Sequence, residues 1–215
     1  MIIKALETSL KISIISILIS LLISLILIYK NKLNKNKLIE TLILFPIFIP
    51  PSALGYIVLI TLGKQGFIGQ FLDKHLSLQI IFTIWAAIIV SVIITLPIMY
   101  QSIKIDVNSI EREVINSAKI CGANNFEIFT KIILPLSKKG IYTGVLLSFA
   151  RSFGEFGATI LVAGNIPGKT QTLSMVMYYA IESNQNSLAT NILILILIIA
   201  LLLISIYKSL ENKND

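Results

Sequence analysis

Long apolar runs dominate this chain and restrict what it can fold into. A helix that crosses the hydrocarbon core of a bilayer needs ~20 mostly apolar residues. Runs of this kind cover Ile12–Tyr29, Leu38–Leu62, Leu78–Tyr100, Gly140–Val162 and Ser187–Tyr207. Only 13% of the residues are charged, against about 25% in soluble domains. The sequence therefore predicts an all-α membrane protein, one domain over residues 1–215, with about five transmembrane helices.

The first run is expected to remain in the mature chain. It is longer than the ~7–15 apolar residues of a signal peptide, and no small-residue cleavage site follows it. Its serines are spaced three or four residues apart and therefore share one helix face; they are Ser9, Ser13, Ser16, Ser20 and Ser24. Small hydroxyl residues allow close helix packing in membranes. The spacing favours a packing stripe and leaves the lining of a polar pathway as the alternative.

Basic residues between the runs predict the orientation. They gather in the first loop, in the polar segment Lys104–Lys139 and at the C-terminal end. These basic residues are Lys30, Lys32, Lys35, Lys37, Lys104, Arg112, Lys119, Lys131, Lys138, Lys139, Lys208 and Lys213. The loops on the opposite side hold Lys64, Lys74 and Lys169. Cytoplasmic loops are enriched in lysine and arginine. We therefore expect a multi-pass protein of the cytoplasmic (inner) membrane with its N-terminus outside and its C-terminus inside, and no nucleic-acid partner despite the net charge of +7.

Prolines interrupt the second apolar run. Pro46, Pro50 and Pro51 precede Gly55, and each proline lacks a backbone donor and clashes with the preceding helical turn. Irregular backbone at membrane depth is tolerated only inside protein or beside a watery cavity. The second helix is therefore predicted to be kinked and to face the protein interior.

The fourth apolar run contains two charges. Arg151 and Glu155 are four residues apart, which places them on one helix face where they can pair, and Gly154 and Gly157 allow close approach. Charges within a membrane span are expensive and usually mark a functional site. The pair is either part of a translocation path or a structural lock between helices or subunits.

The residues that serve most enzymes are missing from the pattern. His75 and Cys121 are the only histidine and cysteine, too few to build a zinc site. Gly164–Thr170 resembles a phosphate loop, but that motif requires glycine where Ala163 stands. We expect neither catalysis nor a metal or other cofactor in this chain.

The polar segment Lys104–Lys139 is predicted to form two short helices. Gly122 can adopt a positive φ and end the first helix, and Asn124 or Asn125 can cap the second. Phe126, Phe129 and Ile133 then share an apolar face. An ordinary solvated loop would explain the charges but not this spacing.

This segment resembles the cytoplasmic signature of bacterial ABC importer permeases. That signature is Glu-Ala-Ala, three residues, Gly, nine residues and Ile-x-Leu-Pro. Asn116 and Ser117 depart from its first two positions. In the family the segment docks into a groove on the ATPase subunit, which would be the role of Asn116, Ser117, Ala118, Gly122, Phe126, Ile132, Leu134 and Pro135. Because Asn116 replaces the usual glutamate, a salt bridge from this position is not expected. The predicted docking role does not depend on such a salt bridge.

A second resemblance covers about Leu38–Tyr179. Ala150–Thr159, Val162–Thr172 and the proline pattern of the second run are similar to molybdate ABC transporter permeases. The resemblance implies a fold like that of type I ABC importer permeases, with two copies forming the pore in the lipid bilayer. Separate ATPase subunits would hold ATP and Mg²⁺, and an external molybdate-binding protein would deliver the oxyanion.

The same resemblance assigns residues to two further places. The translocation path or gate would include Arg151, Gly154, Glu155, Gly157, Pro50 and Pro51, and an external loop would include Asn165, Pro167, Gly168, Lys169 and Thr170. Tungstate, sulfate or thiosulfate are alternative substrates. A channel or secondary transporter without an ATPase, and a membrane scaffold that transports nothing, are the rival functions.

Overall fold

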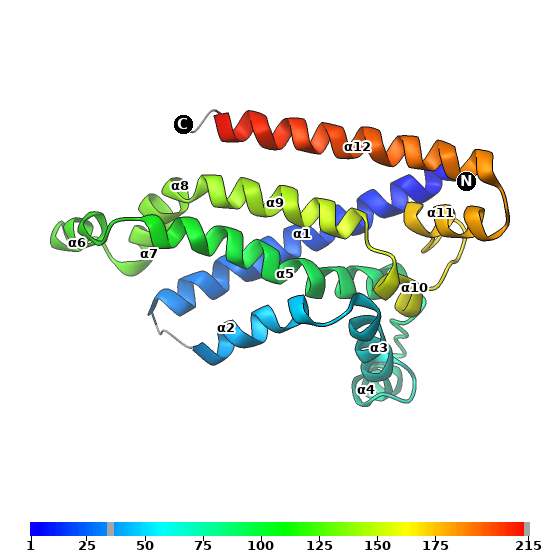
Figure 1. Ribbon diagram of the computed structural model, residues 1–215. Coiled ribbons are helices and arrows are strands. Elements are labelled where there is room, and N and C mark those ends of the chain that lie inside the picture. Colours follow the sequence, from blue (N-terminus) through cyan, green and yellow to red (C-terminus); the bar gives the residue numbers. More distant parts are fainter. Residues whose placement is uncertain (34–36, 213–215) are drawn as a thin grey trace.

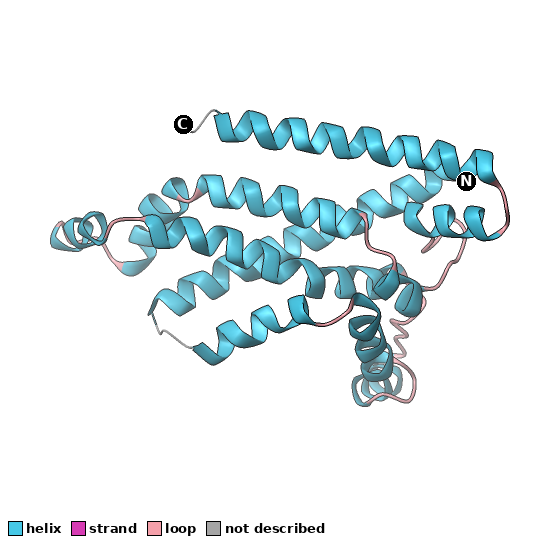
Figure 2. Ribbon diagram, in the orientation of Figure 1, coloured by secondary structure: helices cyan, strands magenta, loops and turns pink. Residues whose placement is uncertain are grey.

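The computed structural model describes residues 1–33 and 37–212, and this part of the chain is helical without any strand (Figures 1 and 2). Lys35 and Lys213 lie outside the described residues. The elements are α1 (Ile2–Leu33), α2 (Lys37–Leu44), the 3₁₀ helix η1 (Phe45–Phe48), α3 (Pro51–Leu62), α4 (Phe67–Leu76), α5 (Ile84–Ser109), α6 (Arg112–Ile120), α7 (Asn125–Ile128), the π-helix η2 (Phe129–Ile133), α8 (Leu134–Leu136), α9 (Lys138–Phe153), α10 (Gly157–Ala163), α11 (Leu173–Glu182) and α12 (Asn186–Asn212).

Helices α1, α5 and α9 form the centre of the bundle, and hydroxyl groups join them. Ser20 Oγ lies 2.7 Å from Thr95 Oγ1 of α5. Ser152 of α9 donates to Ser13 Oγ over 3.1 Å and lies 2.6 Å from Ser91 Oγ. All the serines of the α1 stripe are buried. The packing interpretation is confirmed for Ser9, Ser13 and Ser20, which bond to neighbouring helices. Ser16 donates to the Ile12 carbonyl within α1, and the buried Ser24 hydroxyl has no hydrogen-bond partner among the described residues.

The second apolar run is broken much more sharply than a kink. The helical stretch Lys37–Phe48 and helix α3 meet at an angle of 113°. Pro46 lies in the 3₁₀ turn, Pro50 is the N-cap of α3 and Pro51 is its first residue. The predicted break is confirmed, because successive prolines prevent the helix from continuing, and the run Leu38–Leu62 is a bent helix pair that can form one broken span.

The third membrane helix begins and ends later in the chain than the predicted Leu78–Tyr100. Helix α5 begins at Ile84 and continues to Ser109, so its last two turns belong to the polar segment. The backbone N–H of Phe82 donates to the Val162 carbonyl over 2.8 Å, and this contact holds the preceding residues outside the helix. Trp85, the second residue of this helix, is 59% exposed.

The fourth apolar run is also divided. Helix α9 ends at Phe153, and α10 begins after a break at residues 154–156. Among the described residues, α1, α5 and α12 are long and apolar enough to cross a membrane, and two bent helix pairs raise the possible spans to five. Most side chains of α12 are exposed, and the helix lies along one edge of the bundle (Figure 1).

Candidate functional site

The polar segment forms one end of the molecule, with α6 at its far edge (Figure 1). Gly122 has a φ of +85°, a conformation that glycine adopts without strain. Its N–H bonds to the Lys119 carbonyl, and the Ala123 N–H bonds to the Ala118 carbonyl, both over 3.0 Å. These bonds close the end of α6 in the way of a Schellman motif. The prediction that Gly122 adopts a positive φ and ends the first helix is confirmed.

Asn124 starts the second helix of this segment. Its side-chain oxygen accepts the Glu127 N–H over 2.9 Å, and the Glu127 carboxylate accepts the Asn124 N–H over 3.0 Å. This capping box satisfies two backbone donors at the helix start. The hydrogen bond from the Asn124 backbone, followed by the contact with Lys131, lowers the pKa of Glu127. Asn124, and not Asn125, is therefore the N-cap of this helix.

One face of the second helix is fixed to the bundle and the other is free. Phe129 and Ile133 are buried in a core cluster with Ile103, while Phe126 is 63% exposed and touches the ring of Tyr29 only at its edge. The helix therefore rests on the bundle through two of the three predicted apolar residues and keeps the third at the surface.

The predicted docking residues differ in exposure. Gly122, Asn116, Ser117, Phe126 and Pro135 are exposed, whereas Ala118, Ile132 and Leu134 are partly buried. Exposed apolar side chains surround them, namely Val114, Ile120 and Leu136. An exposed apolar patch of this kind on a protein surface commonly marks an interaction site.

The two breaks in the apolar runs meet in space. A Cβ atom added to Gly55 of α3 would lie 2.7 Å from the Ala158 Cα of α10, and one added to Gly157 would lie 3.8 Å from the Ser52 nitrogen. The absence of a side chain at Gly55 thus allows the backbones of α3 and α10 to touch. Ser52, which follows Pro51 in the chain, thus lies beside Gly157.

Arg151 and Glu155 form the predicted ion pair with a different geometry. The distance from Arg151 Nη1 to Glu155 Oε2 is 2.6 Å. The two residues do not share a helix, because α9 ends before Gly154; the chain turns there, and the Glu155 Oε1 atom accepts the Ala158 N–H over 2.9 Å. The Glu155 side chain is 3% exposed and that of Arg151 is 35% exposed. The carboxylate is fully engaged, while the guanidinium keeps an accessible edge.

The loop after α10 is a compact turn. Thr170 is buried, donates from Oγ1 to the Gly164 carbonyl over 3.1 Å and accepts the Ile166 N–H over 3.2 Å. The Gln171 side chain, which the sequence did not single out, donates to Asn165 Oδ1 over 2.8 Å. Of the predicted loop residues, Pro167, Gly168 and Lys169 are exposed. These three are the ones available for contact with another molecule.

Comparison with known proteins identifies the family. Residues 16–214 match the model for the binding-protein-dependent transport system inner membrane component. The chain belongs to this family. The permease is 40% identical over 166 residues to YvgM of Bacillus subtilis, provisionally named a molybdenum transport system permease, covering 77% of this chain and 73% of YvgM. It is 36% identical over 185 residues to the molybdenum transport system permease ModB of Haemophilus influenzae, covering 84% and 80% respectively.

A solved structure shares the fold of the permease. One chain in the crystal structure of a bacterial ABC transporter involved in the import of the acidic polysaccharide alginate superposes with a TM-score of 0.80 at 17% identity. The match covers 98% of this chain and 79% of that chain. The all-α fold like that of an ABC importer permease, predicted from the sequence, is confirmed.

One ion pair of the permease could not be predicted from the sequence. Lys104 was assigned to the water-facing segment, but it is partly buried on α5 and pairs with Glu40 of α2. Its ammonium also lies 5.9 Å from the centre of the Tyr100 ring. The position of Glu40 as the first acid after the basic loop is only a weak indication of pairing. Nothing in the local pattern connects Glu40 with Lys104, which lies 64 positions later.

Proposed function

We propose that this permease is the membrane subunit of an ATP-driven importer for molybdate. The exposed polar segment, in which Gly122 ends one helix and Asn124 caps the next, carries the proposal because it offers a partner an ordered, exposed surface at one end of the bundle. The substrate follows from the relatives named for molybdenum transport. Molybdate is a dianion, and removing a charge from water into hydrocarbon is prohibitively costly, so a protein path is needed.

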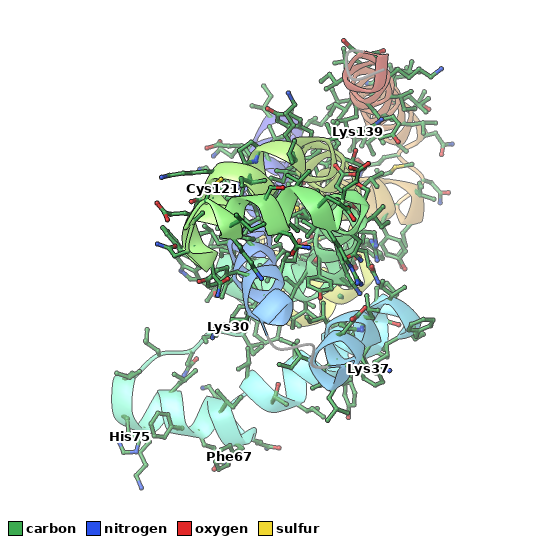
Figure 3. All side chains as sticks on the ribbon, turned by 90° about the vertical axis from the view of Figure 1, so that its left-hand side faces the viewer. Lys30, Lys37, Phe67, His75, Cys121 and Lys139 are labelled. Carbon is green, nitrogen blue, oxygen red and sulfur yellow. The ribbon has the colours of Figure 1, made fainter. Side chains whose placement is uncertain are left out.

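ATP hydrolysis is assigned to separate subunits that dock on the polar segment from the cytoplasm. Figure 3 looks onto this end of the molecule and shows Lys30, Lys37 and Lys139 there, together with Cys121. Helix α12 ends on the same side of the molecule, and the N-terminus lies at the other end (Figure 1). Since basic residues favour the cytoplasmic side, the N-terminus is outside and the polar segment inside. The exposed loop at Lys169 then faces the external binding protein.

A second copy of the permease completes the path. The broken helices at Pro50 and at Gly154 support this assignment, because irregular backbone at membrane depth requires a protein or watery environment. The accessible edge of Arg151 supplies N–H donors for an oxyanion, and Glu155 holds this side chain in place. Two such half-sites facing each other would enclose the route for the anion.

Uptake measurements in proteoliposomes test the function. The permease is reconstituted with its ATPase and loaded binding protein, and radiolabelled molybdate uptake is compared with internal ATP and with ADP. We expect uptake only with ATP and binding protein, reduced by excess tungstate more than by sulfate. Uptake driven by an ion gradient without ATP would contradict the proposal. The 28% identity to a sulfate permease of Prototheca wickerhamii makes sulfate the alternative substrate, and sulfate uptake without molybdate uptake would establish it.

Cysteine labelling in intact cells tests the orientation. In a Cys121→Ser background, single cysteines at Lys74 and Lys169 should react with an impermeant reagent added outside, and a cysteine at Lys37 should react only after permeabilisation. Labelling at Lys37 from outside would reverse the orientation.

A further inference from the structure

Asp106 closes the base of the polar segment. It lies three residues before the end of α5, and its carboxylate Oδ2 accepts the backbone N–H of Gly140 in the first turn of α9. The first N–H groups of a helix have no partner within the helix, and a carboxylate is favoured there by the helix dipole. The Asp106 side chain thus joins α5 and α9, the two helices that flank the short helices of the polar segment.

The contact at this base is unusually close. A Cβ atom added to Gly140 would lie 2.5 Å from the Ser102 carbonyl oxygen and 3.0 Å from the Asp106 side chain. One turn later, a Cβ atom at Gly144 would lie 2.9 Å from Met99 Sδ. The two glycines let α9 lie directly on α5, and the Asp106 hydrogen bond fixes how the two helices are aligned along their axes.

We infer that Asp106 is a positioning residue for energy transfer: it makes the ends of α5 and α9 move as one unit when a partner displaces the polar segment. This inference rests on the proposed function. Without the bond, displacement of α6 and α7 would be absorbed by separation of the helix ends. The residue itself lies on α5, apart from the exposed surface at Phe126 and Ile120, so its effect on transport is indirect.

Three variants separate this role from simple folding. Asp106→Ala removes the acceptor, and Asp106→Asn keeps an oxygen at the same place without the charge. Asn108→Ala is the matched control, because Asn108 is exposed in the same last turn of α5. Each variant is reconstituted with the ATPase and binding protein, and molybdate transported per ATP hydrolysed is measured together with hydrogen exchange of the Gly140 amide.

Asp106→Ala should assemble with the ATPase and hydrolyse ATP while transporting less molybdate per ATP. Exchange of the Gly140 amide should accelerate about fivefold or more, as expected for the loss of one net hydrogen bond. Asp106→Asn should recover most of the transport ratio, and Asn108→Ala should match the wild type. If Asp106→Ala fails to accumulate, Asp106→Asn should still show faster Gly140 exchange and a partly reduced ratio.

Two results would overturn the inference. One is a wild-type transport ratio and wild-type exchange in Asp106→Ala or, where that variant fails to accumulate, a wild-type ratio together with wild-type exchange in Asp106→Asn. The other is a parallel loss of uptake and hydrolysis, which indicates a structural role only. Failure of the proposed function is a separate outcome, since the wild-type permease itself would then show no ATP-dependent molybdate uptake.

Discussion

Replacing Gly55 with alanine should destabilise the permease through a single backbone contact. The new Cβ atom would lie 2.7 Å from the Ala158 Cα and 2.8 Å from its carbonyl oxygen. Carbon atoms pack best at about 3.5–4.0 Å, so α3 and α10 must separate by about 1 Å. Both atoms that would be struck belong to the backbone, and rotation of a side chain cannot relieve the clash.

The expected magnitude is a balance of two effects. Overpacking of this kind costs about 1–3 kcal/mol, and the upper part of that range applies because backbone must move. Alanine recovers about 1 kcal/mol of helix propensity within α3. The net loss is about 1–2 kcal/mol, which for a chain of this size lowers the melting temperature by about 2–8 °C.

Gly157→Ala is the matched control, because its Cβ atom would meet the Ser52 nitrogen at 3.8 Å, an ordinary contact. Heating the detergent-purified variants and measuring the remaining folded fraction by size-exclusion chromatography compares the two. Gly55→Ala should melt below the wild type, and Gly157→Ala should melt at or above it. Equal melting temperatures for the two variants would refute the close approach of α3 and α10.

Three further predictions concern the polar segment and the ion pair. Gly122→Val should reduce binding-protein-stimulated ATP hydrolysis with membrane insertion intact, since a φ of +85° costs a branched residue about 1–3 kcal/mol; normal stimulation would contradict the placement. Arg151→Gln should reduce protein level and uptake more than Glu155→Gln, because it leaves the buried carboxylate unpaired, and the double variant should recover part of the loss; strict additivity in the mutant cycle would exclude direct coupling. The lowered pKa of Glu127 means that its ionised form stabilises the capping box above the usual pKa of 4.5, and that this contribution is lost as the pH falls through the lowered pKa. Protection of the Asn124 amide against hydrogen exchange, relative to its intrinsic rate, should therefore fall at acidic pH in the wild type but not in Glu127→Gln. The same pH dependence of protection in both proteins would disprove the effect.

Features fixed by local chemistry could be predicted from the sequence. The end of α6 follows from Gly122, which needs a positive φ, and the start of α7 from the cap at Asn124. The break before α3 follows from Pro50 and Pro51, although its angle does not, because the angle depends on how α3 packs against α10.

Features that depend on distant partners could not be predicted. The start of α5 follows from the hydrogen bond between Phe82 and Val162, residues far apart in the chain. The partial burial of Lys104 requires Glu40. The spacing of Arg151 and Glu155 indicated a pair for the wrong reason, because it assumed a continuous helix. A periodic pattern identifies helices, but only the assembled fold determines where each one stops.

The charged ends of α1 indicate how deep the ion pair lies in the bilayer. The helix has 32 residues, about 48 Å, which exceeds the hydrocarbon thickness of about 30 Å. Its apolar stretch between Lys11 and Lys30 spans about 27 Å, so these lysines mark the two boundaries. Ser13 lies just inside the boundary near the N-terminus, and its hydrogen bond to Ser152 places the neighbouring Arg151 at the same shallow depth. The guanidinium therefore lies near one boundary of the bilayer, where hydration lowers the cost of its charge. Under the proposed function, an anion arriving from that side would meet it before reaching the middle of the bilayer.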